Sequence, residues 1–155
     1  DPDTGARNVG EVHVVTESGQ GEAVPMVSLD DYCERHGIGR VDYIKIDVEG
    51  FEASVLAGAE RVIADNPDIL VQTEYEPAHL ARYGDPTGLA RRLQAQGLSP
   101  FALGWADGSP EALGTLEGYR GEIVWSRRDL TKGSASPVDG GGRCGVLGRA
   151  SAAVD

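Results

Sequence analysis

The sequence predicts an α/β protein in which parallel strands are followed by a final antiparallel strand. Apolar segments of strand length alternate with helical segments between residues 24 and 105, as in parallel βαβ units. The last two apolar segments are joined by a turn-rich stretch without a clear helix, which favours antiparallel pairing. A chain of 155 residues has room for one domain with one sizeable core.

Three stretches of different composition divide the chain. Residues 1–23 are polar and glycine-rich, although residues 11–15 alternate in a way that predicts a short strand. Residues 24–130 contain all the other predicted helices and strands. In residues 131–155 glycine, serine and alanine dominate without periodicity, so we expect a disordered tail.

The charge of the chain limits its partners. Its 25 acidic and 14 basic residues give a net charge of −11, which repels phosphate backbones and anionic lipids. No apolar run approaches the ~20 residues of a membrane-spanning helix, and the polar N-terminus does not resemble a secretory leader. Cys33 and Cys144 are far apart and belong to no zinc-binding motif. We therefore expect a cytoplasmic protein with free thiols and with neither a nucleic-acid nor a membrane partner.

The first elements after the polar segment are a strand, a short helix and a second strand. Because Pro25 cannot donate a ladder hydrogen bond, residues 24–28 are predicted to form an edge strand. Ser28 is a suitable N-cap for a helix over residues 29–36, which a glycine would end. The nearly continuous apolar run over residues 41–47 predicts a parallel strand covered on both faces.

A single long helix is predicted over residues 51–64. Its apolar residues fall on one stripe at helical spacing, and Asn66 and Pro67 would end it. The other predicted elements are a strand over residues 69–74, a helix over 86–96, a strand over 99–105, a turn-rich segment over 104–121 and a strand over 122–126.

Two acidic residues close neighbouring predicted strands and form the centre of a candidate site. Asp47 ends the strand over residues 41–47, and Glu74 ends the strand over residues 69–74. A right-handed crossover would put these strands side by side, so the two carboxylates could converge on one ligand or one divalent metal. Ligands of open α/β sheets bind outside the carboxyl ends of the strands, which is where both acids lie.

Five further residues lie near this pair in the sequence or at the predicted strand ends. Glu49 lies in the turn after Asp47, where it either joins the site or stabilises a helix N-terminus. Gly50 permits an unusual backbone angle or a close ligand approach, and His79, on the loop after the second strand, is a weaker candidate for a general base. Lys45 is predicted to pair with Asp47 or Glu74, although a snorkelling side chain is an alternative. Glu52 is interpreted as an ordinary first-turn helix acid.

Three segments together resemble one enzyme family. They are VSLDDY at residues 27–32, VDYIKIDVEGFE at residues 41–52 and VLAGA at residues 55–59. This contiguous pattern resembles the FkbM-family methyltransferases, in which it is followed by a strand ending in glutamate, as residues 69–74 do. The resemblance is strong over about residues 24–75 and extends weakly to the last predicted strand.

The resemblance implies a Rossmann-like fold and transfer of a methyl group from S-adenosylmethionine to a hydroxyl of a small molecule or sugar. It implies that Asp47 and Gly50 lie beside the cofactor, and that Asp47 and Glu49 face the transfer site. The glycine-rich cofactor loop of the family should precede residue 24, yet residues 1–23 contain no such loop. We therefore expect the carboxyl-terminal portion of the methyltransferase sheet, with little activity alone and an exposed strand edge that promotes self-association.

Methyl transfer to a hydroxyl requires a base for the proton. Asp47, alone or with a metal shared with Glu74, is the first candidate, and His79 is the second. Two other functions remain open at this stage. One is a hydrolase or transferase that binds Mg²⁺ through Asp47, Glu49 and Glu74. The other is a non-catalytic half-domain that pairs with a partner through its open sheet edge.

Overall fold

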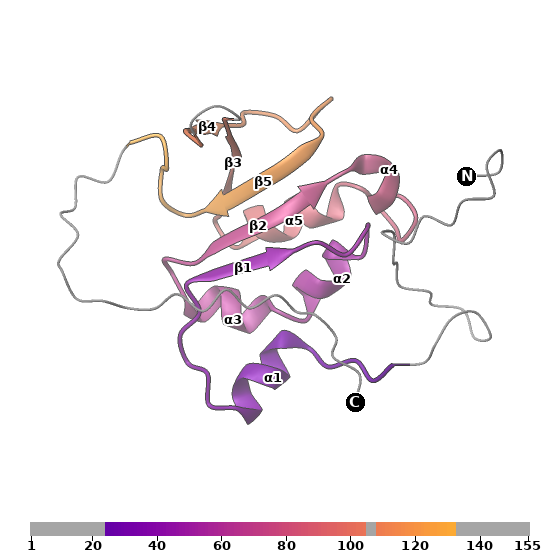
Figure 1. Cartoon of the computed structure of the whole chain (residues 1–155), viewed down its shortest axis with the longest axis vertical. Coiled ribbons are helices and arrows are strands. Elements are labelled where there is room, and N and C mark those ends of the chain that lie inside the picture. The colour runs from indigo at the N-terminus through magenta and orange to yellow at the C-terminus, as the bar shows by residue number, and fades with distance from the viewer. Residues whose placement is uncertain (1–23, 105–107, 133–155) are drawn as a thin grey trace.

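The computed structural model of the chain describes residues 24–104 and 108–132 (Figure 1). The predicted strand at residues 11–15 and the predicted tail from residue 133 onward lie outside the described residues. Helices and strands alternate along the first part of the fold, as predicted. The elements are α1 (Leu29–Arg35), β1 (Tyr43–Ile46), α2 (Glu52–Ala57), α3 (Glu60–Asp65), β2 (Leu70–Tyr75), α4 (Pro77–Leu80), α5 (Gly88–Ala95), β3 (Ser99–Leu103), β4 (Pro110–Ala112) and β5 (Gly121–Ser126).

The described strands form one mixed sheet in the order β1-β2-β5-β3-β4. Strands β1 and β2 are parallel neighbours, as the sequence predicted, and Ile46 lies opposite Thr73. Strand β5 is antiparallel to both β2 and β3, which confirms the predicted antiparallel final strand. Strand β4, which pairs with β3, lies in the segment for which only turns were predicted. The protein is therefore a mixed α/β protein with its last strand in the interior of the sheet.

The hydrophobic core lies against one face of this sheet. Strand β2 alternates strictly, because Val71, Thr73 and Tyr75 are buried while the residues between them are half-buried. Helices α2 and α5, which follow β1 and β2, contact each other beside this buried face. The buried core residues of the helices include Leu56, Ile63, Leu89 and Leu93, and those of β5 include Ile123 and Trp125.

Strand β1 is covered less than the sequence predicted. It lies at the edge of the described sheet, and only its last residue, Ile46, is fully buried. The side chain of Tyr43 is 44% exposed, and Lys45 is also exposed. The prediction of a strand buried on both faces is therefore wrong, because helices cover only one face at this position. An open edge at this strand was predicted, and it is present in the described residues.

The long helix predicted over residues 51–64 is divided into α2 and α3 at Gly58. The carbonyl of Gly58 accepts a hydrogen bond from the backbone N–H of Asp30, at 2.9 Å. The Asp30 carboxylate accepts hydrogen bonds from the backbone N–H groups of Arg61 and Val62, at 3.0 and 2.9 Å. A Cβ at residue 58 would lie 3.1 Å from the Cβ of Ser28. The start of α1 therefore docks where the glycine interrupts the helix.

Two other local predictions need correction. Residues 24–28 form no strand, and their apolar side chains Val24, Met26 and Val27 are exposed. Pro25 lacks a donor, and no described strand pairs with this segment. Helix α4 lies where a loop was predicted after β2, and its start is capped by the Glu76 side chain, with Pro77 in the first turn. By contrast, Ser28 caps α1 as predicted, through a 3.0 Å bond from the Asp31 N–H.

The residue after β5 joins three elements of the fold. The guanidinium of Arg127 donates hydrogen bonds to the carbonyl oxygens of Ile63, Asn66 and Gln96, at 3.1, 3.2 and 2.9 Å. These carbonyls lie at the carboxyl-terminal ends of α3 and α5, where helices leave such groups without internal partners. One side chain thus fixes both helix ends to the end of β5.

Candidate active site at the carboxyl ends of β1 and β2

The loop that leaves β1 is folded around a buried carboxylate. Glu52, in the first turn of α2, has a side chain that is only 1% exposed. Its Oε1 atom accepts hydrogen bonds from the backbone N–H groups of Gly50 and Val48, at 3.1 and 3.3 Å. The sequence identified Glu52 only as an ordinary helix acid, and its burial was missed. The side chain instead fixes the conformation of the loop that contains the site acids.

Gly50 brings this loop against α4. Its φ is +106°, which confirms the predicted unusual backbone angle. A Cβ at this position would lie only 2.4 Å from the carbonyl oxygen of His79. The close neighbour of Gly50 in the described residues is therefore the backbone of α4. Phe51 and Tyr83 make an edge-to-face contact beside it, with ring centroids 5.4 Å apart.

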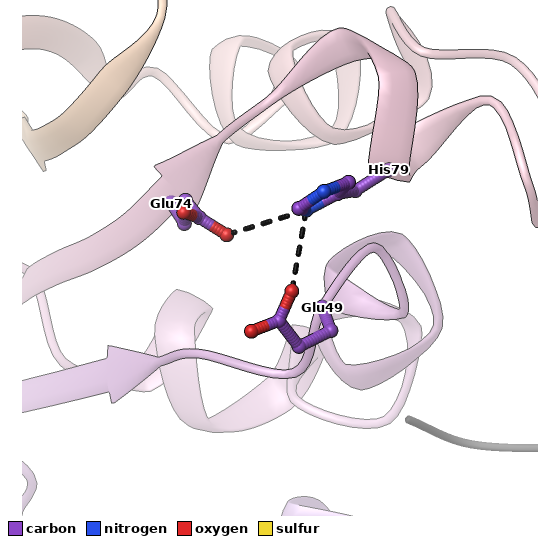
Figure 2. A group of neighbouring side chains, drawn as sticks. All are labelled: Glu49, Glu74 and His79. Carbon is purple, nitrogen blue, oxygen red and sulfur yellow. Dashed lines mark ion pairs between the residues drawn. The ribbon is translucent and has the colours of Figure 1, made fainter. Parts of the chain in front are cut away.

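Three site candidates from three different elements come together at this contact. Glu49 lies in the loop after β1, Glu74 near the end of β2, and His79 on α4 (Figure 2). The Nδ1 atom of His79 lies 3.3 Å from a carboxylate oxygen of Glu49 and 3.8 Å from one of Glu74. One ligand atom from each residue lies within 4.8 Å of the other two. All three side chains are between 28% and 34% exposed, so a ligand can reach them.

The backbone at Glu49 explains why this acid reaches His79. Glu49 has a φ of +53° and is the one non-glycine residue with a positive φ among the described residues. Such a conformation costs about 1–2 kcal/mol for a residue with a Cβ. The Glu49 side chain extends from this loop toward His79 (Figure 2). Glu49 precedes α2, whose first-turn acid is Glu52.

The electrostatics of the cluster raise the pKa of the Glu74 carboxyl. Burial raises the pKa of the Glu74 carboxyl most, and the charges of Glu49 and Asp47 raise it further, while His79 lowers it. The Nδ1 atom of His79 is closed off from solvent and makes no hydrogen bond, because its contacts with the carboxylates lack hydrogen-bond geometry. The cluster thus contains a carboxyl that holds its proton more tightly than usual and an imidazole nitrogen without a hydrogen-bond partner.

Asp47 lies close to the cluster and has a partner of its own. Its carboxylate pairs with the Lys45 ammonium at 2.9 Å, which confirms the ion pair predicted for Lys45. The hydrogen bond with Asp47 raises the pKa of Lys45. The Asp47 side chain is 51% exposed, and its charge is near enough to influence Glu74. The group that could hold a metal ion consists of Glu49, Glu74 and His79, without Asp47.

A separate groove of about 910 Å³ lies between α3 and α5, away from the acidic cluster. Several arginines line it, yet each of them is already engaged. Arg92 pairs with Glu60 at 2.6 Å, Arg91 pairs with Asp85, and Arg127 is bound to backbone carbonyls. These arginines are engaged in ion pairs or backbone hydrogen bonds within the fold, so this groove is not our candidate site.

The fold and the site define an α/β protein with a carboxylate–histidine cluster at the edge where such sheets bind ligands. A sequence model of the family described as "Methyltransferase FkbM domain" matches residues 2–97. The chain belongs to this family and is a methyltransferase, which confirms the resemblance found in its sequence. The family implies a Rossmann-like fold, and its members typically use S-adenosylmethionine.

The matched range contains every candidate site residue, from Asp47 to His79. No curated protein and no solved structure matches the chain. Among the described residues, none of the helices combines the length and apolar character needed to cross a membrane.

Proposed function

We propose that the chain transfers a methyl group from S-adenosylmethionine to a hydroxyl oxygen of a small molecule or sugar. One observation supports this most: in a chain of the FkbM family, Glu49, Glu74 and His79 meet at the carboxyl ends of parallel strands. This edge is where α/β sheets bind their ligands, and its side chains are accessible. The hydroxyl acceptor agrees with the need for a nearby base.

The proposed step is a displacement at the methyl carbon. A lone pair of the acceptor oxygen attacks this carbon, and the carbon–sulfur bond breaks with its electron pair remaining on sulfur. The products are the methyl ether and S-adenosylhomocysteine, and the hydroxyl proton passes to a base on the protein. The protein contributes mainly by aligning the reacting atoms and by accepting this proton.

Two carboxylates are suited to accept the proton. The raised pKa of Glu74 favours this carboxylate as a proton acceptor in the metal-free chain. Asp47 is held by Lys45 at the same edge of the sheet. His79 is the reserve candidate, with an Nδ1 atom that faces Glu49 and Glu74. We assign Asp47 and Gly50, on the loop after β1, to the cofactor side of the site.

The test is isothermal titration of the chain with S-adenosylhomocysteine. Binding tighter than about 100 μM, or roughly −5.5 kcal/mol, would support a cofactor site in this chain. Gly50→Ala should weaken this binding, because the added Cβ would collide with α4. Gly97→Ala, where a Cβ would meet nothing within 4 Å, is the matched control. Absence of binding by the wild-type chain would contradict the proposal for this chain.

We also propose that β1 can pair with a second copy of the chain. The support is its position at the edge of the described sheet, together with the exposed Tyr43 side chain. Sedimentation equilibrium over a range of concentrations should detect a dimer. Lys45→Pro, which removes a backbone donor from the edge, should weaken it. A monomer at every concentration would contradict this proposal and leave the methyl-transfer proposal unaffected.

A further inference from the structure

We infer that Glu49, Glu74 and His79 bind one divalent metal ion of the Mn²⁺ or Co²⁺ type. Metal binding itself does not depend on the proposed methyl transfer, whereas the use of the metal in that reaction does. The inference concerns the three side chains shown in Figure 2, which come from the β1 loop, from β2 and from α4.

The spacing of the three residues fits a single ion. Ligand atoms bind such metals at about 2.0–2.2 Å, so two ligands of one ion lie about 3–4.2 Å apart. The distances from His79 Nδ1 to the carboxylates of Glu49 and Glu74 are 3.3 and 3.8 Å, within this range. Since one ligand atom from each residue lies within 4.8 Å of the other two, small side-chain adjustments complete the arrangement.

The His79 nitrogen provides an independent observation. Buried polar atoms almost always have a hydrogen-bond partner, and Nδ1 of His79 has none although it is closed off from solvent. It points between two carboxylates, as Figure 2 shows. In the neutral tautomer with its proton on Nε2, the Nδ1 lone pair of His79 is directed at the two carboxylates, an arrangement that a cation between them would stabilise. A metal ion satisfies the nitrogen and both acids together.

The local charge also favours a cation. Among the described residues, the ion pairs of Glu49 and Glu74 involve His79 alone, with no lysine or arginine. Lys45 pairs with Asp47 and Arg120 with Glu76, at 2.9 and 3.2 Å. Two carboxylates and one imidazole suit borderline divalent ions better than Ca²⁺ or Mg²⁺, which prefer oxygen ligands.

Three protein ligands leave coordination positions open to other molecules. An acceptor hydroxyl could occupy one of them, which would hold its oxygen at the site of the proposed methyl transfer. With Glu74 engaged as a ligand, Asp47, which is paired with Lys45 and 51% exposed, is the remaining candidate to accept the hydroxyl proton. The metal would thus divide the two acids by role, with Glu74 as a ligand and Asp47 as the base.

The test is titration of the chelator-treated chain with Mn²⁺, followed by calorimetry and electron paramagnetic resonance. We expect one ion per chain and a nitrogen coupling in the pulsed spectrum that His79→Gln abolishes. Glu49→Gln and Glu74→Gln should each weaken binding at least about tenfold, or about 1.4 kcal/mol. The matched control is Glu122→Gln, since Glu122 lies opposite Glu74 on β5 but outside the cluster. It should change the affinity less than threefold.

Three outcomes would overturn the inference: no binding, no nitrogen coupling, or equal weakening by Glu122→Gln, which would indicate diffuse attraction to an acidic surface. Thermal unfolding of each variant without metal establishes that it folds. Titrating Mn²⁺ without cofactor, and S-adenosylhomocysteine with chelator, separates the two proposals. Binding of S-adenosylhomocysteine without Mn²⁺ binding would overturn the metal site alone, and the reverse result would contradict only the cofactor site.

Discussion

The contact between α1 and α3 and the loop after β1 are both rich in acids, yet they use them in opposite ways. At the first, the Asp30 carboxylate accepts two backbone hydrogen bonds from the start of α3, and Glu34 pairs with Arg61 at 2.8 Å. At the second, Glu49 and Glu74 face each other across His79. Acids that hold backbone donors stabilise the fold. Acids that face each other repel and so destabilise the fold, and they are available to bind a ligand.

The loop after β1 contains both kinds of acid within four residues. Glu52 is buried and holds two backbone N–H groups, whereas Glu49 is accessible and has a strained backbone. The difference lies in the partners of each carboxylate and not in its position along the chain.

Gly50→Ala should lower the free energy of unfolding by about 3 kcal/mol, because the new Cβ would overlap the His79 carbonyl at 2.4 Å and the backbone has a positive φ. Gly97→Ala introduces backbone strain at a φ of +81° without a collision, and should cost about 1 kcal/mol. Urea unfolding measures both. Equal losses would show that the contact between the loop and α4 contributes little.

Asp30→Ala should lower the free energy of unfolding by about 1–2 kcal/mol, because two backbone donors at the start of α3 lose their acceptor. Asp31→Ala, at the neighbouring acid in the first turn of α1, should cost less than about 0.5 kcal/mol. The same urea titration compares them. If the two variants were equally stable, the assignment of Asp30 as the cap of α3 would be wrong.

In the metal-free chain, Glu49→Gln should not lower the free energy of unfolding, in contrast to Gly50→Ala and Asp30→Ala. Removing this charge relieves its repulsion with Glu74, so stability should be unchanged or raised by no more than about 0.5 kcal/mol at these accessible positions. The amide retains the size of the side chain. Thermal unfolding in the presence of a chelator measures the change. A loss as large as that of Asp30→Ala would place Glu49 among the structural acids.

The reactivity of the Cys33 thiol should report on the packing of α1 without a substitution in that region. Burial raises the pKa of the Cys33 thiol most, and Asp30 raises it further, while Arg61 lowers it. Because only the thiolate reacts, alkylation should be slower than that of a free thiol, with a midpoint at higher pH. Mass spectrometry on a Cys144→Ser chain follows the single remaining thiol. Reaction as fast as in the unfolded chain would contradict the packing of α1.

Much of the fold was predictable because its signals are local. Apolar segments of strand length, which alternate with helical segments, predicted β1, β2, β3 and β5. Serine at residue 28 predicted the start of α1. The break at Gly58 was not predictable in this way, since the stripe of apolar residues continues through it. The break depends on docking of Ser28 and Asp30, about thirty residues earlier in the chain, at that glycine.

The residues of the candidate site could be predicted from the sequence, whereas their arrangement in space could be predicted less well. Strand ends identified Asp47 and Glu74, and Glu49 and His79 were identified by their nearness to those ends. Their grouping depends on the contact of Gly50 with α4, which no local pattern specifies. The signal in the sequence for the buried Glu52 carboxylate, which holds the loop after β1, was the spacing of Gly50 and Glu52. Glu76 followed by Pro77 was the signal for α4.

The position of β5 has a consequence for how the chain is made. It is the last strand of the described residues, yet it lies between β2 and β3, and Arg127 just after it secures the ends of α3 and α5. While a ribosome synthesises the protein, β2 and β3 emerge before β5. The edges that β5 will pair with stay unpaired until it has been synthesised. Such edges invite association between nascent chains. A chain that stops before residue 121 would therefore be an open sheet rather than a smaller domain.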